Sequence, residues 1–174
     1  MVPVPIFGRR SQWSAAELRS NAMPTFEHSF SVDAPIEAVR AFHADTSALK
    51  ALSPPGTFAQ MHSIEPLAEG SVSEFTLWMG PLPVRWRAVH RDVGPDAFTD
   101  VQDRGPAASW SHTHRFVDLG DGHTRVDDRI VFEHKAGIRG LVTRVLFCRP
   151  ALRALFAWRA HATRAASSVH PRRD

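Results

Sequence analysis

The stretch FTDVQDRGPAASWSHTHRFVDLGDGHTRVDDRIVFEHKAGIRG, residues 98–140, decides the fold of this chain. It contains two runs in which apolar and polar residues alternate, separated by the Gly- and Asp-rich segment Asp118–Gly122. Alternation with a period of two is typical of β-strands, and a turn of this composition between two such runs predicts an antiparallel hairpin.

One face of the predicted hairpin mixes aromatic, imidazole and carboxylate side chains. Successive side chains on a strand point to opposite sides of the sheet. The inner face therefore carries Trp110, His112, His114, Phe116, Val126, Asp128, Ile130 and Phe132. This mixture is unusual for a plain apolar core and marks the face as a candidate functional surface.

The pairing of the two strands brings the carboxylate of Asp128 next to a hydrogen-bond donor. A hairpin that pairs Phe116 with Thr124 sets His112 opposite Asp128, and a slip of two residues sets His114 or Trp110 there instead. A buried charge without a partner is strongly unfavourable, so we expect Asp128 to be paired in either register.

The rest of the chain predicts further strands and two groups of helices. Alternation interrupted by Gly-Pro breaks predicts strands over 25–32, 58–64, 72–79, 84–93 and 98–103. We expect Asp33 to cap a helix that ends near His43, and a second short helix to follow Asp45. Apolar spacings of three and four predict a helix over 138–168, kinked or restarted at Pro150. The order predicts an α+β fold in which a curved antiparallel sheet of about seven strands wraps around the C-terminal helix, with a cavity between them.

Length and composition fit one compact domain with additions at both ends. The chain has 174 residues, of which 43% are hydrophobic, enough for one substantial core. We expect an N-terminal extension over 1–22, with a short helix opened by a capping box at Ser14–Glu17. The domain itself is predicted over 23–168, followed by a disordered tail over 169–174.

Charge and cysteine content exclude several classes of protein. The net charge is only +3 and the arginines are spread along the chain, so we expect no nucleic-acid partner. The single Cys148 allows neither an internal disulfide framework nor a Cys-rich zinc site. No apolar run is long enough for stable membrane insertion, and the N-terminus lacks the apolar core of a signal peptide, so we expect a cytoplasmic protein. The sequence does not decide whether the chain forms a homodimer.

The chain resembles the START-related helix-grip superfamily of ligand-binding and polyketide cyclase-like proteins, in particular a bacterial branch of it. Four motifs carry the resemblance: Phe98-x-Asp100-x-Gln102-x-x-Gly105-Pro106, Trp110-x-His112-x-His114-x-Phe116, Gly122-x-Thr124-x-x-x-Asp128-x-Ile130-x-Phe132 and Phe156-x-Trp158-Arg159. The similarity covers about residues 24–163. Lys135 and His90 depart from the pattern, which usually has proline and an aliphatic residue there. The resemblance implies a helix-grip fold with a hydrophobic cavity; it implies a reaction less strongly, because such folds host carriers, cyclases and hydrolases.

The first interpretation of the inner face is a ligand-binding site. Aromatic side chains supply contact area and polar groups orient a small apolar molecule, such as an aromatic, polyketide-like or lipid-like ligand. The candidate ligand-binding residues are Trp78, Trp86, His90, Phe98, Asp100, Gln102, Trp110, His112, His114, Asp128, Phe132, Phe156, Trp158 and Arg159. Arg159 needs an anion if it is buried, and Asp100, Asp128 or a ligand carboxylate qualifies.

Several other interpretations stay open, and the sequence does not decide whether the chain is an enzyme. Asp128, His112 and His114 suit general acid–base catalysis of the polyketide cyclase or dehydratase type, in which a histidine removes a proton next to a ketone. The same side chains also suit a purely structural hydrogen-bonded network. The histidine pair with Asp128 or His90 is a weaker candidate for zinc, and we expect no metal and no cofactor. A protein-interaction module with a collapsed pocket is a further alternative.

Overall fold

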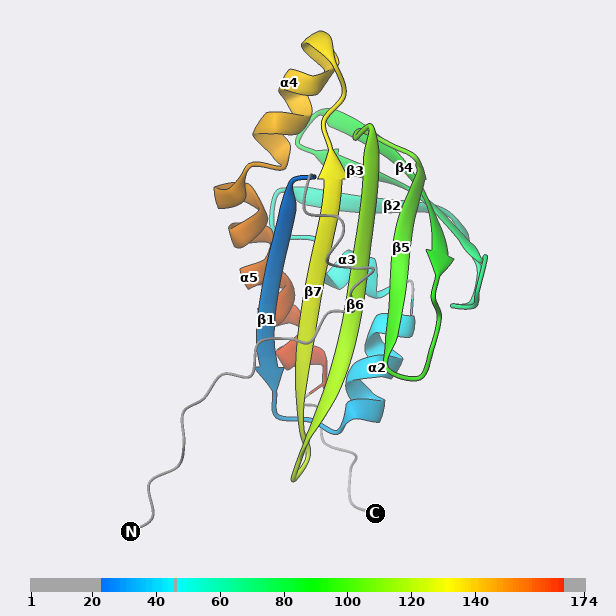
Figure 1. Ribbon diagram of the computed structural model, residues 1–174, viewed down its shortest axis with the longest axis vertical. Helices are drawn as coiled ribbons and strands as arrows, with labels where there is room; N and C mark the ends of the chain where they lie inside the picture. Colours follow the sequence, from blue (N-terminus) through cyan, green and yellow to red (C-terminus); the bar gives the residue numbers. More distant parts are fainter. Residues whose placement is uncertain (1–22, 46, 168–174) are drawn as a thin grey trace.

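A computed structural model describes residues 23–45 and 47–167 of the chain (Figure 1). The expected extension over 1–22, its short helix and the expected tail over 169–174 lie outside the described residues. None of the described helices combines the length and the apolar character that crossing a bilayer requires.

Seven described strands form one antiparallel sheet. They are β1 (Thr25–Val32), β2 (Thr57–Ile64), β3 (Val72–Met79), β4 (Leu82–Arg91), β5 (Ala97–Arg104), β6 (Ser109–Gly120) and β7 (His123–Glu133). Their order is β1-β7-β6-β5-β4-β3-β2, so β2 to β7 follow one another as a meander and β1 completes the edge beside β7. The predicted sheet is confirmed, with most strand ends within two residues of the expected positions.

The described helices lie on one face of this sheet or beyond its end. They are α2 (Ile36–Ala44), α3 (Ala48–Ala51), α4 (Gly137–Leu146) and α5 (Arg149–Ser167). The long α5 packs against β1 and α2, while α4 projects past the end of the sheet (Figure 1). The expected interruption near Pro150 is confirmed: α4 ends at Leu146 and Pro150 lies in the first turn of α5, where its missing N–H costs nothing.

Two local expectations need correction. The β6–β7 register pairs Phe116 with Val126, not with Thr124, so the register slipped by two residues is the one that forms. A β-bulge between Asp118 and Gly120 adds a one-residue shift beside the turn. The N-cap of α2 is Pro35 instead of Asp33, whose carboxylate accepts a hydrogen bond from His123 Nδ1 at 3.0 Å.

The buried core consists of two apolar clusters along the covered face of the sheet. The cluster nearer the β6–β7 turn contains Phe30, Val32, Ala34, Val39, Phe98, Phe116, Val126 and Ala160. The other contains Phe26, Ala107, Trp110, Ile130, Phe132, Leu152 and Phe156. His112, His114 and Asp128 belong to neither cluster, although all three are buried on the same strands.

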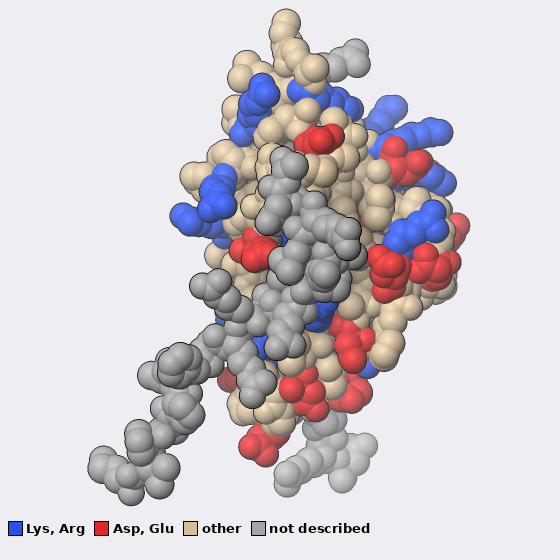
Figure 2. Space-filling view, in the orientation of Figure 1, with Lys and Arg blue, Asp and Glu red and all other residues tan. Residues whose placement is uncertain are grey.

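Surface charge of both signs is visible on the face of the molecule seen in Figure 2. Acidic side chains gather toward the end of the sheet that carries the β6–β7 turn, and basic ones are more frequent toward the α4 end. The two signs are mixed between these ends, and no single extended basic groove forms on the visible face.

Candidate functional site

A cavity of about 160 Å³ lies between the inner face of the sheet and the helices. Strands β3 to β6 form its floor, α2, Asp45 and α3 form one side, and the α4–α5 junction forms the other. The lining residues are His43, Asp45, Ala48, Leu49, Leu52, Ser73, Phe75, Leu77, Trp86, Ala88, His90, Phe98, Asp100, Trp110, His112, His114, Phe147, Leu155, Phe156 and Arg159.

Aromatic rings in mutual contact form one wall of this cavity. Trp86 lies parallel to Phe75 with ring centroids 6.2 Å apart, and meets Trp110 edge-on at 5.4 Å. Phe147, at the α4–α5 junction, lies 4.7 Å from Trp110. Such tilted and offset contacts are the favoured geometries of aromatic pairs, so this wall is a fixed apolar surface.

The polar wall comes from rows of residues that face one another across neighbouring strands. His90 on β4, Asp100 on β5 and His112 on β6 stand in one row, and His114 stands opposite Asp128 on β7. Side chains opposite each other on one face of a sheet are within contact distance. Strand register therefore assembles the cluster from residues that are far apart in sequence.

His114 is held between two carboxylates. Its Nδ1 lies 2.8 Å from Asp128 Oδ1 and its Nε2 lies 3.4 Å from Asp100 Oδ2. The Nδ1–H is not directed at the Asp128 oxygen, so that contact is an ion pair rather than a linear hydrogen bond. Burial alone would lower the pKa of His114, but the two carboxylates outweigh it and raise the pKa to about 9. His114 is therefore an imidazolium at neutral pH.

The two carboxylates are correspondingly ionised. Burial opposes their charge, yet His112 and His114 hold the pKa of Asp128 well below its usual range. The pKa of Asp100 is also lowered, since His114 in particular outweighs the effect of burial. The Asp100 side chain keeps 30% of its accessible surface, whereas that of Asp128 keeps 5%. Asp100 therefore borders the cavity, and Asp128 lies behind the histidines.

His112 has the opposite protonation state to His114. Its Nε2 lies 3.1 Å from Asp128 Oδ1, so the Nε2–H donates to the carboxylate. Burial and the neighbouring positive charge of His114 lower the pKa of His112 to about 4. The ring is then neutral with its lone pair on Nδ1, which has no hydrogen-bond partner among the described residues. His112 thus presents an acceptor to the cavity.

His43 on α2 presents a second acceptor, and the sequence interpretation did not include it. Its Nδ1 donates to the carbonyl of Val39 at 2.9 Å, one turn earlier on the same helix. This bond fixes the proton on Nδ1 and leaves the lone pair on Nε2. Burial, followed by the charge of His114, lowers the pKa of His43 to about 4. The ring contacts His114 and Phe116 at centroid distances of 5.7 Å and 5.1 Å.

His90 supports the cluster from β4. Its Nε2 lies 3.3 Å from Asp100 Oδ1, and its Nδ1 lies 2.9 Å from the hydroxyl of Ser71. Both ring nitrogens thus contact protein groups. His90 stands where the pattern of the resemblance usually has an aliphatic residue, and it gives Asp100 a second imidazole partner beside His114.

Arg159 on α5 lines the cavity from the helix side. Its guanidinium carbon lies 5.2 Å from the centre of the Phe156 ring, a cation–π contact. Its Nε is buried without a hydrogen-bond partner, and no described carboxylate is close enough to form an ion pair with it. Burial lowers the pKa of Arg159, and the more distant Asp128 and Asp100 oppose this effect.

The cavity unites most of the ligand-binding residues expected from the sequence. Those that line it are Trp86, His90, Phe98, Asp100, Trp110, His112, His114, Phe156 and Arg159. The residues that the sequence interpretation missed include His43, Phe75, Leu77, Phe147 and Leu155.

Five of the expected residues do not line it, each for a physical reason. Asp128 lies behind the two histidines, and Phe132 packs in an apolar core cluster. Trp78 lies on the opposite face of β3 from Phe75 and donates to Gln60 Oε1 at 3.0 Å. The last two, Gln102 and Trp158, form hydrogen bonds with backbone groups. The Gln102 amide donates to the carbonyl of Ala107 and accepts from its N–H, and Trp158 Nε1 donates to the carbonyl of Ala51.

Asp100, His112 and His114 also form a group whose potential metal-ligand atoms lie within 4.8 Å of one another. A cation bound there needs a lone pair from each imidazole. Both nitrogens of His114 face carboxylates, and the resulting ion pairs hold its second proton. The donor set therefore fits a protonated histidine between carboxylates better than a metal centre.

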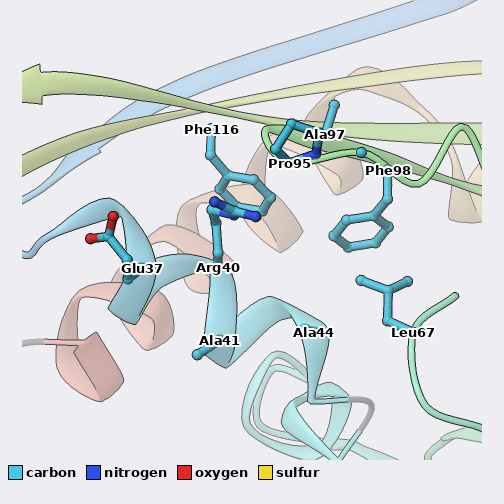
Figure 3. Close-up of a pocket in the computed structure, with 10 residues that line it drawn as sticks. Glu37, Arg40, Ala41, Ala44, Leu67, Pro95, Ala97, Phe98 and Phe116 are labelled. Carbon is cyan, nitrogen blue, oxygen red and sulfur yellow. The ribbon is translucent and has the colours of Figure 1, made fainter.

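A second pocket of about 360 Å³ is also lined by Phe98 (Figure 3). Glu37 and Arg40 of α2 line it together with Phe98, Phe116 and Leu67 (Figure 3). It is larger than the first cavity but contains none of the buried histidines or carboxylates. We therefore place the candidate site in the first cavity.

The sheet, the long C-terminal helix and the cavity between them define the helix-grip fold of START-like proteins. Solved structures with this fold confirm the assignment. An aromatase/cyclase from Streptomyces sp. R1128 is similar, with a TM-score of 0.67 and 16% identity over 83% of this chain and 93% of that chain. A START superfamily protein from Mycobacterium smegmatis has a TM-score of 0.63 and 12% identity, over 82% of this chain and 96% of its own.

A plant protein has the same fold. A truncated norcoclaurine synthase from Thalictrum flavum has a TM-score of 0.65 and 16% identity, over 86% of this chain and 96% of its own. No family model and no curated protein sequence matches the chain. At these identities the likeness establishes the fold, and the function must be argued from the site.

Proposed function

We propose that this protein binds a small, largely apolar molecule in the cavity between the sheet and α5. The observation that carries the proposal is the division of the cavity into an aromatic wall and a polar wall whose hydrogen-bonding capacity is not used up by the protein. His112 Nδ1 and His43 Nε2 are free acceptors, and Arg159 is a donor without an anion. A concave, largely apolar space with a few convergent polar groups is the usual form of a small-molecule site.

Native mass spectrometry of the freshly purified chain tests this proposal, followed by denaturation and identification of any released compound. We expect a co-purified apolar molecule. Ala88→Phe places a large ring inside the cavity and should abolish the extra mass. Val89→Phe is the matched control, because Val89 is the next residue on β4 and points away from the cavity.

Loss of the bound compound in both variants, or in neither, would contradict binding in this cavity. If the purified chain carries no compound, binding is measured instead by titrating the chain with small aromatic probes. Tryptophan fluorescence reports directly on the cavity, since Trp86 and Trp110 line it. Failure of every such probe to bind the wild-type chain would overturn the proposal.

A second candidate function is general acid–base catalysis, favoured by the state of the Asp128–His112 pair. An ionised carboxylate fixes the tautomer of a neutral histidine whose other nitrogen faces the cavity, an arrangement suited to removing a proton from a bound ketone. The guanidinium of Arg159 would stabilise the enolate that forms. Two of the solved structures with this fold carry the names of enzymes, an aromatase/cyclase and a norcoclaurine synthase.

The compound identified in the binding experiment provides the test of catalysis. We expect His112→Gln to abolish turnover while leaving binding within a few-fold. Equal turnover by the wild type and the variant would remove this candidate. The alternative of a protein-interaction module with a collapsed pocket is less well supported, because the cavity is open and has polar walls.

A further inference from the structure

We infer that Arg159 is an anion subsite and that the ligand of this cavity is an aromatic carboxylic acid. This inference rests on the proposed ligand-binding function and specifies its chemistry. It follows from the state of Arg159, from the position of that residue beside the free acceptors, and from the shape of the apolar wall.

The first argument concerns the missing counterion. A buried guanidinium is stable when an anion and hydrogen-bond acceptors surround it. The Nε of Arg159, a partly buried residue, is itself buried, and among residues 23–45 and 47–167 no group accepts a hydrogen bond from it. Asp100 and Asp128 act on it only from a distance, since His114 already lies between them.

The second argument concerns position. Phe156 connects Arg159 to the histidine cluster: the guanidinium carbon lies 5.2 Å from its ring centre and the His112 ring lies 5.3 Å from it. The His112 and His114 rings are 3.9 Å apart, and His43 follows at 5.7 Å from His114. Arg159 and the two free acceptors therefore border the same part of the cavity.

The third argument concerns the class of anion. A guanidinium is a planar fork of N–H donors that matches the two oxygens of a carboxylate. Trp86, Trp110, Phe75 and Phe147 provide ring surfaces against which the rest of the ligand packs. The volume of about 160 Å³ fits a compact aromatic body better than a long acyl chain.

Two probes of nearly equal shape test the inference: 2-naphthoate, which is an anion at pH 7, and 2-acetonaphthone, in which a neutral methyl ketone replaces the carboxylate. Binding is measured by calorimetry or by quenching of tryptophan fluorescence. We expect the wild-type chain to bind 2-naphthoate at least about tenfold more tightly, the effect of a charge-assisted hydrogen-bonded pair.

Arg159→Gln should remove this preference by weakening 2-naphthoate about tenfold, with 2-acetonaphthone within twofold of the wild type. Arg153→Gln is the matched control, because Arg153 is an exposed arginine of the same helix and its loss changes the net charge equally. We expect Arg153→Gln to bind both probes as the wild type does. If Arg159→Gln does not fold, Arg159→Lys retains the charge without the fork and should lose part of the preference.

The outcomes separate the inference from the proposed function. Equal binding of the two probes to the wild type would overturn the anion subsite and leave ligand binding intact. Equal weakening of both probes by Arg159→Gln would assign Arg159 a structural role and also overturn the subsite. Failure of both probes to bind the wild-type chain would overturn the proposed function together with the inference.

Discussion

The two halves of the sheet share the same alternation of residues, but one half forms a sealed core and the other forms a cavity wall. On β7 the inward residues are covered by side chains of α5, and the result is a sealed core: Phe132 packs with Leu152 and is 4% exposed. On β3 and β4 the inward residues face the cavity, and Phe75, Leu77 and Trp86 are only partly buried. A period of two in the sequence thus specifies an inward face, and the position of the helix decides whether that face becomes core or ligand site.

The largest expected effect comes from the same substitution made in each half. Phe132→Ala should destabilise the fold by about 3–5 kcal/mol, because it leaves a cavity in a sealed core. Phe75→Ala should cost about 1 kcal/mol, since that ring already borders an open space. Urea denaturation measures both. Equal losses would show that the two halves are packed alike, and would weaken the case for a binding cavity.

The two carboxylates of the cluster make a second comparison. Asp128→Ala should destabilise by about 3 kcal/mol, because it leaves His114 and His112 buried without their shared partner. Asp100 is more accessible, so Asp100→Ala should cost about 1 kcal/mol. The isosteric Asp128→Asn separates loss of charge from loss of volume. A change near zero in Asp128→Ala would contradict the buried ion pair.

The pH dependence of stability distinguishes His114 from the two neutral histidines. The folded-state pKa of His114, about 9, lies above the 6.5 of the unfolded chain. Its stabilisation is therefore complete below pH 6.5 and is lost as the pH rises toward 9, by at most about 3 kcal/mol. His112 and His43 have folded-state pKa values near 4, so their contribution is present above pH 6.5 and is lost as the pH falls toward 4.

These opposite slopes predict a stability maximum near pH 6.5, measurable by thermal unfolding across the range. In His114→Gln the decline between pH 6.5 and pH 9 should disappear, while the decline on the acid side remains. A wild-type chain whose stability stays constant from pH 6.5 to pH 9 would show that His114 is not held as an imidazolium.

Sequence patterns predicted the hairpin faces well, because strand periodicity depends only on local geometry. The exact register was harder to predict. The strands pair two residues away from the expected register, with a one-residue bulge between Asp118 and Gly120, and nothing in a Gly- and Asp-rich turn fixes where the extra residue lies. On β3 the strand limits were correct, yet alternation alone does not say which face turns inward. Trp78 was expected at the site but lies on the outer face of β3, and Phe75 lines the cavity instead.

His43 was missed for a different reason, and it gives the smallest of the expected effects. Its role depends on α2 docking beside a hairpin about 70 residues later in the chain, a tertiary contact that no local pattern encodes. His43→Leu keeps an apolar contact with Phe116 and loses one hydrogen bond to Val39, so it should cost about 1 kcal/mol. Its effect on binding should be selective, because only the Nε2 acceptor is removed from the cavity.

A pair of probes that differ by one hydroxyl isolates that acceptor. The wild-type chain should bind 6-hydroxy-2-naphthoate about fivefold more tightly than 2-naphthoate, since an imidazole lone pair accepts the added O–H. His43→Leu should abolish this gain and leave 2-naphthoate unchanged; His62→Leu, an exposed histidine on β2, serves as the control. If the gain survives in His43→Leu and disappears in His112→Gln, the hydroxyl binds on the sheet side. The polar wall would then be built by strand register alone, with α2 serving only to close the cavity.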